Sequence, residues 1–264
     1  MKFLLLSLAL LAPSVHAQEW AKQKLEKSSR HREWVKVEHD GRKVDAYIAY
    51  PEVSTKAPVV LVIHEIFGLS DWAQLAADEF AAAGYIAIAP DLLSGKGPNG
   101  GGTKSLGDQS SIGKAIGELP PDQITGDLNA AAAYALKQPS ANGSLYVAGF
   151  CYGGGQSFRY ATNRPDLKAA FVFYGPPPAD DSLARIKAPV YGFYGGNDAR
   201  ITATVEPTKE KMKAAGKTYD PIIYEGAGHG FMRGGEDPTT SAPSHAADIK
   251  AREAAWTKLK QLIK

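Results

Sequence analysis

Short apolar runs recur along the chain and alternate with helix-forming segments. Alternation of apolar and polar residues, which is typical of strands with one exposed face, occurs over residues 34–38 and 44–50. The turn residues Asp40-Gly41 between these two segments favour a tight hairpin. Continuously apolar runs are typical of strands that are buried on both faces of a parallel sheet. They predict core strands over residues 59–63, 85–89, 145–150, 169–174, 190–194 and 219–224.

The segments between the core strands predict helices. These cover residues 71–83, 121–137, 156–162, 205–215 and 246–263. Strands and helices in alternation favour right-handed crossovers, and therefore a mostly parallel central sheet flanked by helices, with the hairpin as antiparallel N-terminal edge strands. The sequence contains no repeat and no second core pattern, so we expect a single α/β domain over residues 33–264. The polar segment 18–32 is expected to be a lead-in that forms a surface helix or is loosely held.

The segment 92–120 is the least regular part of the sequence and is rich in glycine. Long excursions in a compact domain are usually functional or mobile, so we expect a mobile loop over the site. Its Gly102-Thr103-Lys104-Ser105 does not match a phosphate-binding loop, because Thr103 stands where that motif needs lysine.

The N-terminus has the pattern of a secretory signal peptide. Lys2 supplies a positive charge, residues 3–12 are apolar, and Val15-His16-Ala17 is a small-x-small cleavage signal. We expect cleavage after Ala17, because this signal follows the apolar run at the right distance. The apolar run itself is too short to span a membrane. A buried N-terminal helix and an uncleaved anchor are the alternatives. The mature protein is then exported, either periplasmic or secreted, and free of the membrane.

Composition and charge narrow the class of partner. The chain has 264 residues, of which 44% are hydrophobic and 22% charged, as in ordinary globular proteins. A net charge of +2 gives no reason to expect nucleic acid or an anionic membrane as a partner. The histidines show no metal-ligand spacing. We therefore expect no metal, no cofactor, a small-molecule substrate and a monomer.

The segment Val147 to Gly155 holds the only cysteine of the chain, Cys151, which excludes an internal disulfide. An apolar run ends at Cys151, which lies between Gly149 and Gly153, and a segment that can start a helix follows. This is the G-x-nucleophile-x-G elbow of α/β-hydrolases, with cysteine in place of serine. Small neighbours suit a strained turn, and the start of a helix favours a thiolate. A buried packing cysteine is the alternative.

Two further chemical groups follow core strands. Asp198 comes after the strand 190–194, and His229 comes after the strand 219–224. Sites of open α/β sheets form at the carboxyl ends of strands, and the order Cys151, Asp198, His229 is that of α/β-hydrolase triads. Taken singly, Asp198 could be a turn or cap residue and His229 a solvated loop residue. Taken together, they predict a nucleophile, an orienting acid and a proton shuttle.

The backbone N–H of Tyr152 is expected to be one oxyanion donor, and that of Ile66 the other. Ile66 belongs to His64-Glu65-Ile66-Phe67-Gly68, which is not a zinc-protease motif because position 68 is glycine. Glu65 lies just past a buried strand. It is either a solvated charge or, if the loop and the elbow are adjacent, a hydrogen-bond partner and resting base of Cys151.

Several motifs of the chain, from about Trp34 to the C-terminus, resemble those of the dienelactone hydrolase family. They are His64-Glu65-Ile66-Phe67-Gly68, Pro90-Asp91-Leu92, Gly149-Phe150-Cys151-Tyr152-Gly153-Gly154, Gly196-Asn197-Asp198 and Gly228-His229-Gly230-Phe231. The resemblance implies a Cys151-Asp198-His229 triad and a Glu65 that holds the thiol until substrate arrives. Members of the family hydrolyse a cyclic enol-lactone that carries a carboxylate, giving maleylacetate, and other relatives are broader carboxylesterases.

The resemblance also bears on substrate binding. Arg233 matches an arginine that binds the substrate carboxylate, whereas the place of a second family arginine reads Gly95, with Lys96 beside it. Lysine offers a point charge instead of a planar fork. Phe67 is expected to line an apolar pocket, with core packing as the alternative. We therefore expect a hydrolase of esters or lactones; the alternatives are a general exported carboxylesterase without anionic preference and an inactive binding protein on the same scaffold.

Overall fold

The computed structural model describes residues 18–263, and the expected signal peptide lies outside the described residues. The described chain forms one eight-stranded sheet in the order β1-β2-β4-β3-β5-β6-β7-β8. The β1–β2 and β2–β4 pairs are antiparallel and the others are parallel, which confirms the mostly parallel sheet and its antiparallel edge. The strands are β1 (Arg32–His39), β2 (Arg42–Ala49), β3 (Ala57–Ile63), β4 (Ile86–Pro90), β5 (Ala141–Phe150), β6 (Ala169–Phe173), β7 (Val190–Gly195) and β8 (Tyr219–Tyr224).

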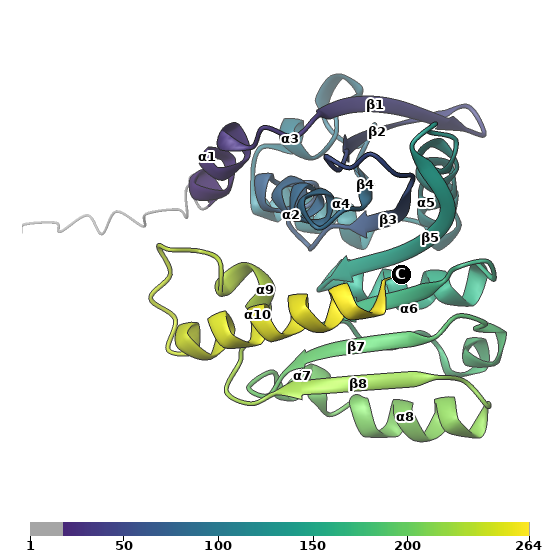
Figure 1. The fold of residues 1–264 in the computed structure, drawn as a ribbon, viewed down its shortest axis with the longest axis vertical. Helices are drawn as coiled ribbons and strands as arrows, with labels where there is room; N and C mark the ends of the chain where they lie inside the picture. Colours follow the sequence, from purple (N-terminus) through teal and green to yellow (C-terminus); the bar gives the residue numbers. More distant parts are fainter. Residues whose placement is uncertain (1–17, 264) are drawn as a thin grey trace, which may run out of the picture.

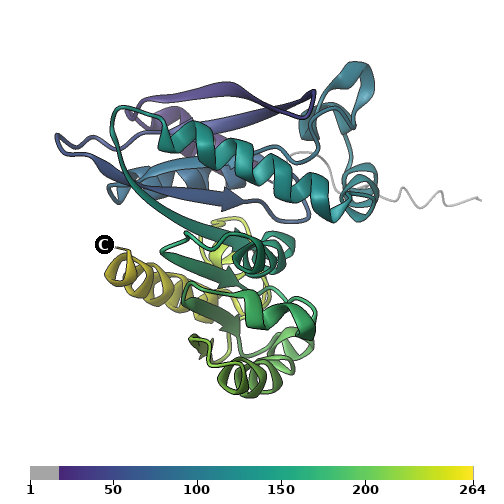
Figure 2. The ribbon, with the colours of Figure 1, turned by 90° about the vertical axis from the view of Figure 1, so that its right-hand side faces the viewer.

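Helices cover both faces of the sheet (Figures 1 and 2). One face carries α1 (Glu19–Lys27), α2 (Asp71–Ala82) and α10 (His245–Leu262). The other carries α5 (Pro121–Leu136), α6 (Tyr152–Asn163) and α8 (Val205–Ala214). Of the helices within residues 18–263, none combines the length and the apolar character needed to cross a bilayer.

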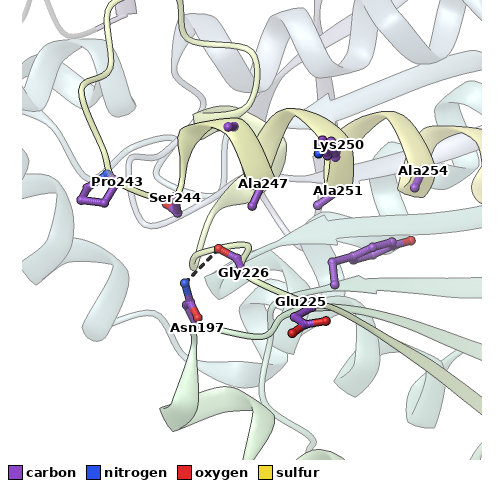
Figure 3. A pocket seen from close by; sticks show the side chains of 11 residues that line it. Asn197, Glu225, Gly226, Pro243, Ser244, Ala247, Lys250, Ala251 and Ala254 are labelled. Atoms are coloured by element: carbon purple, nitrogen blue, oxygen red, sulfur yellow. Dashed lines mark hydrogen bonds between the residues drawn. The ribbon is translucent and has the colours of Figure 1, made fainter.

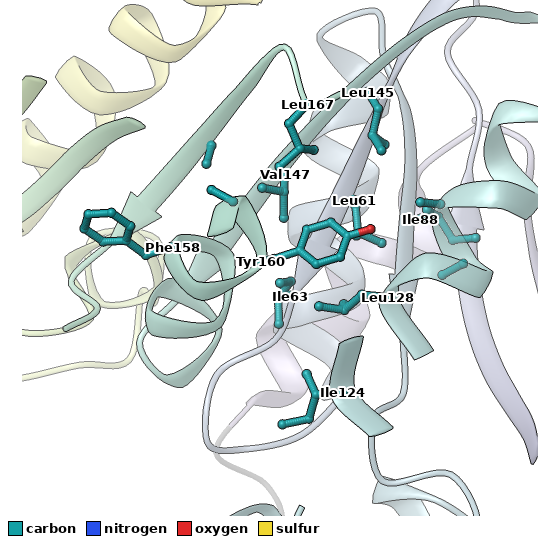
Figure 4. Packing of buried hydrophobic residues seen from close by; sticks show 14 of the residues in the cluster. Leu61, Ile63, Ile88, Ile124, Leu128, Leu145, Val147, Phe158, Tyr160 and Leu167 are labelled. Carbon is teal, nitrogen blue, oxygen red and sulfur yellow. The ribbon is translucent and has the colours of Figure 1, made fainter. Parts of the chain in front are cut away.

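The core has two layers because successive side chains of a strand point to opposite faces of the sheet. In β3, Leu61 and Ile63 pack against the layer of α5 and α6, where Figure 4 shows them beside Leu128 and Tyr160. The alternate residues of β3 pack in the layer under α2 and α10. Each fully buried aliphatic side chain contributes roughly 1.5–3 kcal/mol. The continuous apolar runs of the core strands therefore stabilise both layers.

The hairpin turn between β1 and β2 forms as predicted. Asp40 and Gly41 both have positive φ, 48° and 74°, the conformation that an Asp-Gly type I′ turn requires. His39 and Arg42 flank this turn, and both contact the buried carboxylate of Asp127 on α5, at 2.6 Å from His39 Nε2 and 2.8 Å from Arg42 Nε. These contacts attach the antiparallel edge to the helix that covers it.

The polar lead-in is a packed helix and not a loosely held segment. Helix α1 buries Trp20 and Leu25 against α2, although most of its residues are polar. The Gln18 side chain accepts a hydrogen bond of 3.0 Å from the backbone N–H of Trp72 in the first turn of α2. Lys24 forms an ion pair of 3.0 Å with Glu236. Three buried residues of this short helix, Trp20, Ala21 and Leu25, hold it in place because α2 offers a partner surface.

The segment 92–120 is predicted to be a mobile loop over the site, whereas the structure shows that much of it is regular. It contains the turn η2 (Pro98–Gly100) and the helices α3 (Thr103–Leu106) and α4 (Gln109–Gly117). The buried carboxylate of Asp91 organises its start by accepting hydrogen bonds from the backbone N–H of Thr103 at 2.8 Å and from its Oγ1 at 2.6 Å. Asp108 caps α4 by accepting from the N–H of Ser111 at 2.9 Å.

Candidate active site

The carboxyl ends of the parallel strands meet at one edge of the sheet. Ile63 of β3 is in register with Gly149 of β5, and Phe173 of β6 with Phe193 of β7. The segments that follow these ends therefore come together in space, although they are distant in sequence. This edge is where open α/β sheets hold their ligands.

Cys151 lies between the end of β5 and the start of α6, with φ 55° and ψ −112°. A backbone in this region is strained for a residue other than glycine, by about 1–3 kcal/mol. The neighbouring glycines permit it: a Cβ on Gly149 would lie 1.9 Å from the carbonyl oxygen of Gly153, and a Cβ on Gly153 would lie 2.1 Å from that of Ile63. The elbow therefore packs directly against the end of β3, and its sulfur is at the N-terminus of α6.

The three side chains expected to form a triad are in contact. His229 Nε2 lies 3.1 Å from Cys151 Sγ, and His229 Nδ1 lies 2.5 Å from Asp198 Oδ2. Asp198 directly precedes α7 (Ala199–Thr202), and its side chain is only 7% exposed. The carboxylate therefore holds the imidazole by one nitrogen and leaves the other nitrogen directed at the thiol.

The electrostatics of His229 favour its charged form. Partial burial opposes the charge, but the hydrogen bonds with Cys151 and Asp198 outweigh burial and raise the pKa of His229 to about 9. At neutral pH this histidine can therefore carry a proton beside the sulfur. That arrangement suits a cysteine nucleophile, because the thiolate is the reactive form.

Two backbone N–H groups of the segments that meet at the elbow are unpaired within the described chain. Those of Tyr152, at the start of α6, and of Ile66, in the loop after β3, donate to no acceptor among the described residues. Ile66 is held from outside by Gln109 of α4, whose Nε2 donates to the Ile66 carbonyl oxygen at 3.0 Å. Unpaired N–H groups close to an attacking atom can stabilise an oxygen that gains negative charge during attack.

Glu65 does not occupy the position expected for a partner of Cys151. Its carboxylate, 3% exposed, accepts from Arg233 Nε at 2.8 Å and from the Tyr174 hydroxyl at 3.3 Å, while the thiol is paired with His229. A buried carboxylate is stabilised far better by a guanidinium than by a thiol. The loop and the elbow are adjacent, as the expectation required, but in this conformation the arginine takes the carboxylate.

The residues expected to bind substrate divide into two groups. The Arg233 guanidinium lies 4.8 Å from the centre of the Phe67 ring and pairs with Glu65, and the Arg233 side chain is 28% exposed. Arg233, Phe67 and Glu65 therefore form one cluster. Lys96 is exposed in the turn after β4, and no described contact joins it to the triad. The structure brings Arg233 and Phe67 together and leaves Lys96 apart.

Tyr174 is a site residue that sequence reasoning missed. It follows β6 with a positive φ of 41°, and its ring packs edge-on against the His229 ring at 5.1 Å. Its buried hydroxyl donates to Glu65, and burial raises the pKa of Tyr174 well above its ordinary value. Its position directly after a core strand, like that of Cys151, was the signal that could have identified it.

The loops that carry the acid and the histidine are joined to each other and to α10. Asn197 Nδ2 donates to the Gly226 carbonyl oxygen at 2.9 Å (Figure 3), and Asp248 accepts from the backbone N–H of Gly228 at 2.7 Å. Behind these loops lies a groove of about 710 Å³. Small side chains of α10 such as Ala247 line it, and no triad residue does. No group of described His, Cys, Asp and Glu residues is arranged to hold a metal ion.

The sheet order, the elbow, and the order of Cys151, Asp198 and His229 along the chain are those of an α/β-hydrolase. The family model of the dienelactone hydrolase family matches residues 44–264. A Methylorubrum extorquens protein provisionally named carboxymethylenebutenolidase is 35% identical over 209 residues, which are 75% of this chain and 71% of that protein. A Salmonella typhimurium protein with the same provisional name is 34% identical over 205 residues, 72% of this chain and 74% of that protein.

Solved structures agree with the sequence comparison. A Klebsiella pneumoniae protein provisionally named dienelactone hydrolase has a TM-score of 0.76 at 26% identity, over 89% of this chain and 98% of that one. The chain belongs to the dienelactone hydrolase family, and it is a dienelactone hydrolase-like hydrolase.

Proposed function

We propose that the protein hydrolyses ester or lactone bonds through a thioester on Cys151. The observation that carries this proposal is the series of contacts from thiol to imidazole to carboxylate, at 3.1 and 2.5 Å, at the carboxyl edge of the sheet. The family membership supports the same reaction class.

The reaction follows from the positions of these groups. The Cys151 sulfur attacks the acyl carbon, and the carbonyl oxygen gains negative charge between the N–H groups of Tyr152 and Ile66. The C–O bond to the leaving group then breaks, and the leaving oxygen takes the proton of His229. Water gives a proton to His229 and attacks the thioester, which releases the acid and restores the thiolate. Asp198 keeps the imidazole in one tautomer throughout.

We also propose that the preferred substrate carries a carboxylate. Arg233 donates only its Nε–H to a described acceptor, so its terminal N–H groups remain for an anion. The relatives provisionally named carboxymethylenebutenolidase point to a lactone with an anionic side group. The resemblance further implies a resting state in which the Glu65 carboxylate holds the Cys151 thiol. The pairing of Glu65 with Arg233 is then a second state of the same carboxylate.

The deciding experiment compares kcat/KM of the reduced mature protein on a carboxylate-bearing enol-lactone and on a neutral short-chain aryl ester. A strong preference for the lactone supports a dienelactone hydrolase. Equal or better rates on the neutral ester make the protein a general exported carboxylesterase. Ligand binding without any turnover would support an inactive binding protein and contradict the hydrolase proposal.

Replacing Arg233 alone would leave the buried carboxylate of Glu65 unpaired, so the contribution of Arg233 is measured in proteins that lack this carboxylate. We therefore compare Glu65→Gln with the double variant Glu65→Gln, Arg233→Met. Loss of a charge-assisted hydrogen-bond pair is expected to raise KM for the lactone by about 10-fold to 100-fold, and KM for the neutral ester by less than about 3-fold. The exposed Arg200, changed to methionine, is the matched control. An equal rise for both substrates would exclude anion recognition by Arg233.

We propose in addition that residues 1–17 direct export and are removed, as the charged, apolar and small-residue pattern of this segment indicates. N-terminal sequencing of protein recovered from the periplasm of a Gram-negative host should then begin at Gln18. A mature chain that still begins at Met1 would contradict this.

A further inference from the structure

His64 is a buried histidine that the proposed reaction does not yet use. It directly follows β3, is fully buried, and its Nδ1 lies 2.8 Å from the carbonyl oxygen of Glu65. A carbonyl oxygen can only accept, so Nδ1 carries the proton and donates it. Burial lowers the pKa of His64 and keeps the ring neutral. Its other nitrogen, Nε2, has no partner among the described residues.

The acceptor of this hydrogen bond belongs to the peptide that ends in a proposed oxyanion donor. The Glu65 carbonyl and the Ile66 N–H are the two ends of one planar peptide unit and point in opposite directions. A hydrogen bond at the oxygen therefore sets the direction of the N–H and polarises it. The Gly68 N–H adds a second, longer bond of 3.2 Å to the same oxygen.

The ring of His64 also contacts the residue of the other donor. The His64 and Tyr152 rings are stacked, with centroids 6.4 Å apart and an interplanar angle of 20°. A Cβ on Gly153 would lie 2.6 Å from the His64 carbonyl oxygen, so the strand end and the start of α6 touch at this point. His64 thus contacts both backbone segments that carry the proposed oxyanion donors.

Packing alone does not explain a histidine at this position. The buried Nε2 of His64 has no partner in the part of the chain that the structure describes, which is destabilising by about 1–3 kcal/mol. An apolar side chain of similar size would fill the same space without this loss of stability. The ring gives one directed hydrogen bond, and the group that receives it is the peptide of the oxyanion loop.

We propose that His64 is a positioning residue of the oxyanion hole: its Nδ1–H holds the Glu65–Ile66 peptide so that the Ile66 N–H faces the substrate oxygen that becomes charged. The proposal rests on the proposed thioester chemistry. His64 exchanges no proton with substrate in this role, and the shuttle remains His229.

Two variants separate the hydrogen bond from the packing. His64→Phe keeps a ring against Tyr152 and removes the donor. His64→Asn places an amide Nδ2 where Nδ1 was and restores the donor. For a neutral aryl ester, His64→Phe is expected to lower kcat by about 10-fold to 100-fold with KM almost unchanged, since full loss of an oxyanion donor lowers kcat by about 10²-fold to 10³-fold. His64→Asn is expected to recover kcat to within about 3-fold of wild type.

Alkylation of Cys151 by iodoacetamide is the control. This displacement at a saturated carbon forms no oxyanion, so the alkylation rate and its pH profile should be the same in wild type and both variants. Acylation by the aryl ester, measured by intact mass, should slow only in His64→Phe. Slowing of both reactions, or of neither, would overturn the role of His64, and so would a His64→Asn variant as slow as His64→Phe. If His64→Phe is not folded, His64→Leu takes its place, with the same outcomes.

The same assay separates this role from the proposed function. Wild-type protein that is alkylated but never acylated would overturn the thioester mechanism itself, and with it the role of His64. Wild-type protein that is acylated normally, with variants that are equally fast, would overturn only the role of His64.

Discussion

Replacing Cys151 with alanine is expected to lower kcat on every ester or lactone by about 10⁴-fold or more. The variant retains the two N–H groups and His229, but no covalent intermediate can form. Alanine also removes the side chain that His229 contacts at 3.1 Å. Turnover of the lactone and the aryl ester, with intact mass measured after mixing, checks this: wild type should gain the mass of the acyl group and Cys151→Ala should not.

Cys151→Ser is the matched variant, because it retains a nucleophilic atom of the same valence. A serine hydroxyl is a weaker nucleophile than a cysteine sulfur and must give up its proton during attack. We therefore expect Cys151→Ser to fall between wild type and Cys151→Ala. Unchanged turnover in Cys151→Ala would show that the nucleophile is another group.

Exchanging His229 for glutamine is expected to lower kcat/KM by about 10³-fold or more. Glutamine can accept or donate a hydrogen bond near the thiol, but it cannot carry a proton to the leaving oxygen or take one from water. Alkylation of Cys151 should slow as well, because no imidazole remains beside the sulfur to take the proton of the thiol. His31→Gln, at a largely exposed histidine, is the control and should behave as wild type.

The pH profile of the wild-type protein is the second test of His229. Its pKa in the folded protein, about 9, lies above the ordinary 6.5. The charged ring therefore contributes to stability fully below about pH 6.5, and the contribution is lost as the pH rises through about 9. We expect kcat/KM to fall over the same basic range, since the leaving group then finds no proton. A fall centred near pH 6.5 would show that His229 is not paired in this way.

The elbow, the loop after β3 and the loop that carries His229 meet because three strand ends are held in register by one sheet. A change in any of these loops therefore acts on the others through short contacts. Gly153 packs against the end of β3, and Asp248 holds the residue before His229. The strain at Cys151 persists because these neighbours leave the backbone no alternative position.

Much of this arrangement was determined by the sequence itself. The strands follow from continuous apolar runs, because burial on both faces leaves no place for polar residues. The hairpin follows from the turn residues Asp40-Gly41. The elbow follows from its glycines, because the backbone segments approach too closely there for a Cβ atom. The chain order of Cys151, Asp198 and His229 predicted a common site, because the carboxyl ends of parallel strands share one edge.

Other features were decided only by the tertiary structure. Glu65 is more than 80 residues from both of its possible partners, Cys151 and Arg233, so its sequence neighbours do not decide between them. The buried carboxylate pairs with the guanidinium, which stabilises its charge better than a thiol does. Tyr174 and His64 looked like ordinary strand ends until folding placed them against His229 and against the Ile66 peptide. Helix α1 is held by the surface of α2, and the short helices of 92–120 begin where the buried Asp91 and the exposed Asp108 accept their first N–H groups. Local sequence sets which backbone conformations are favourable, but the pairing of buried polar groups depends on which segments the sheet brings together.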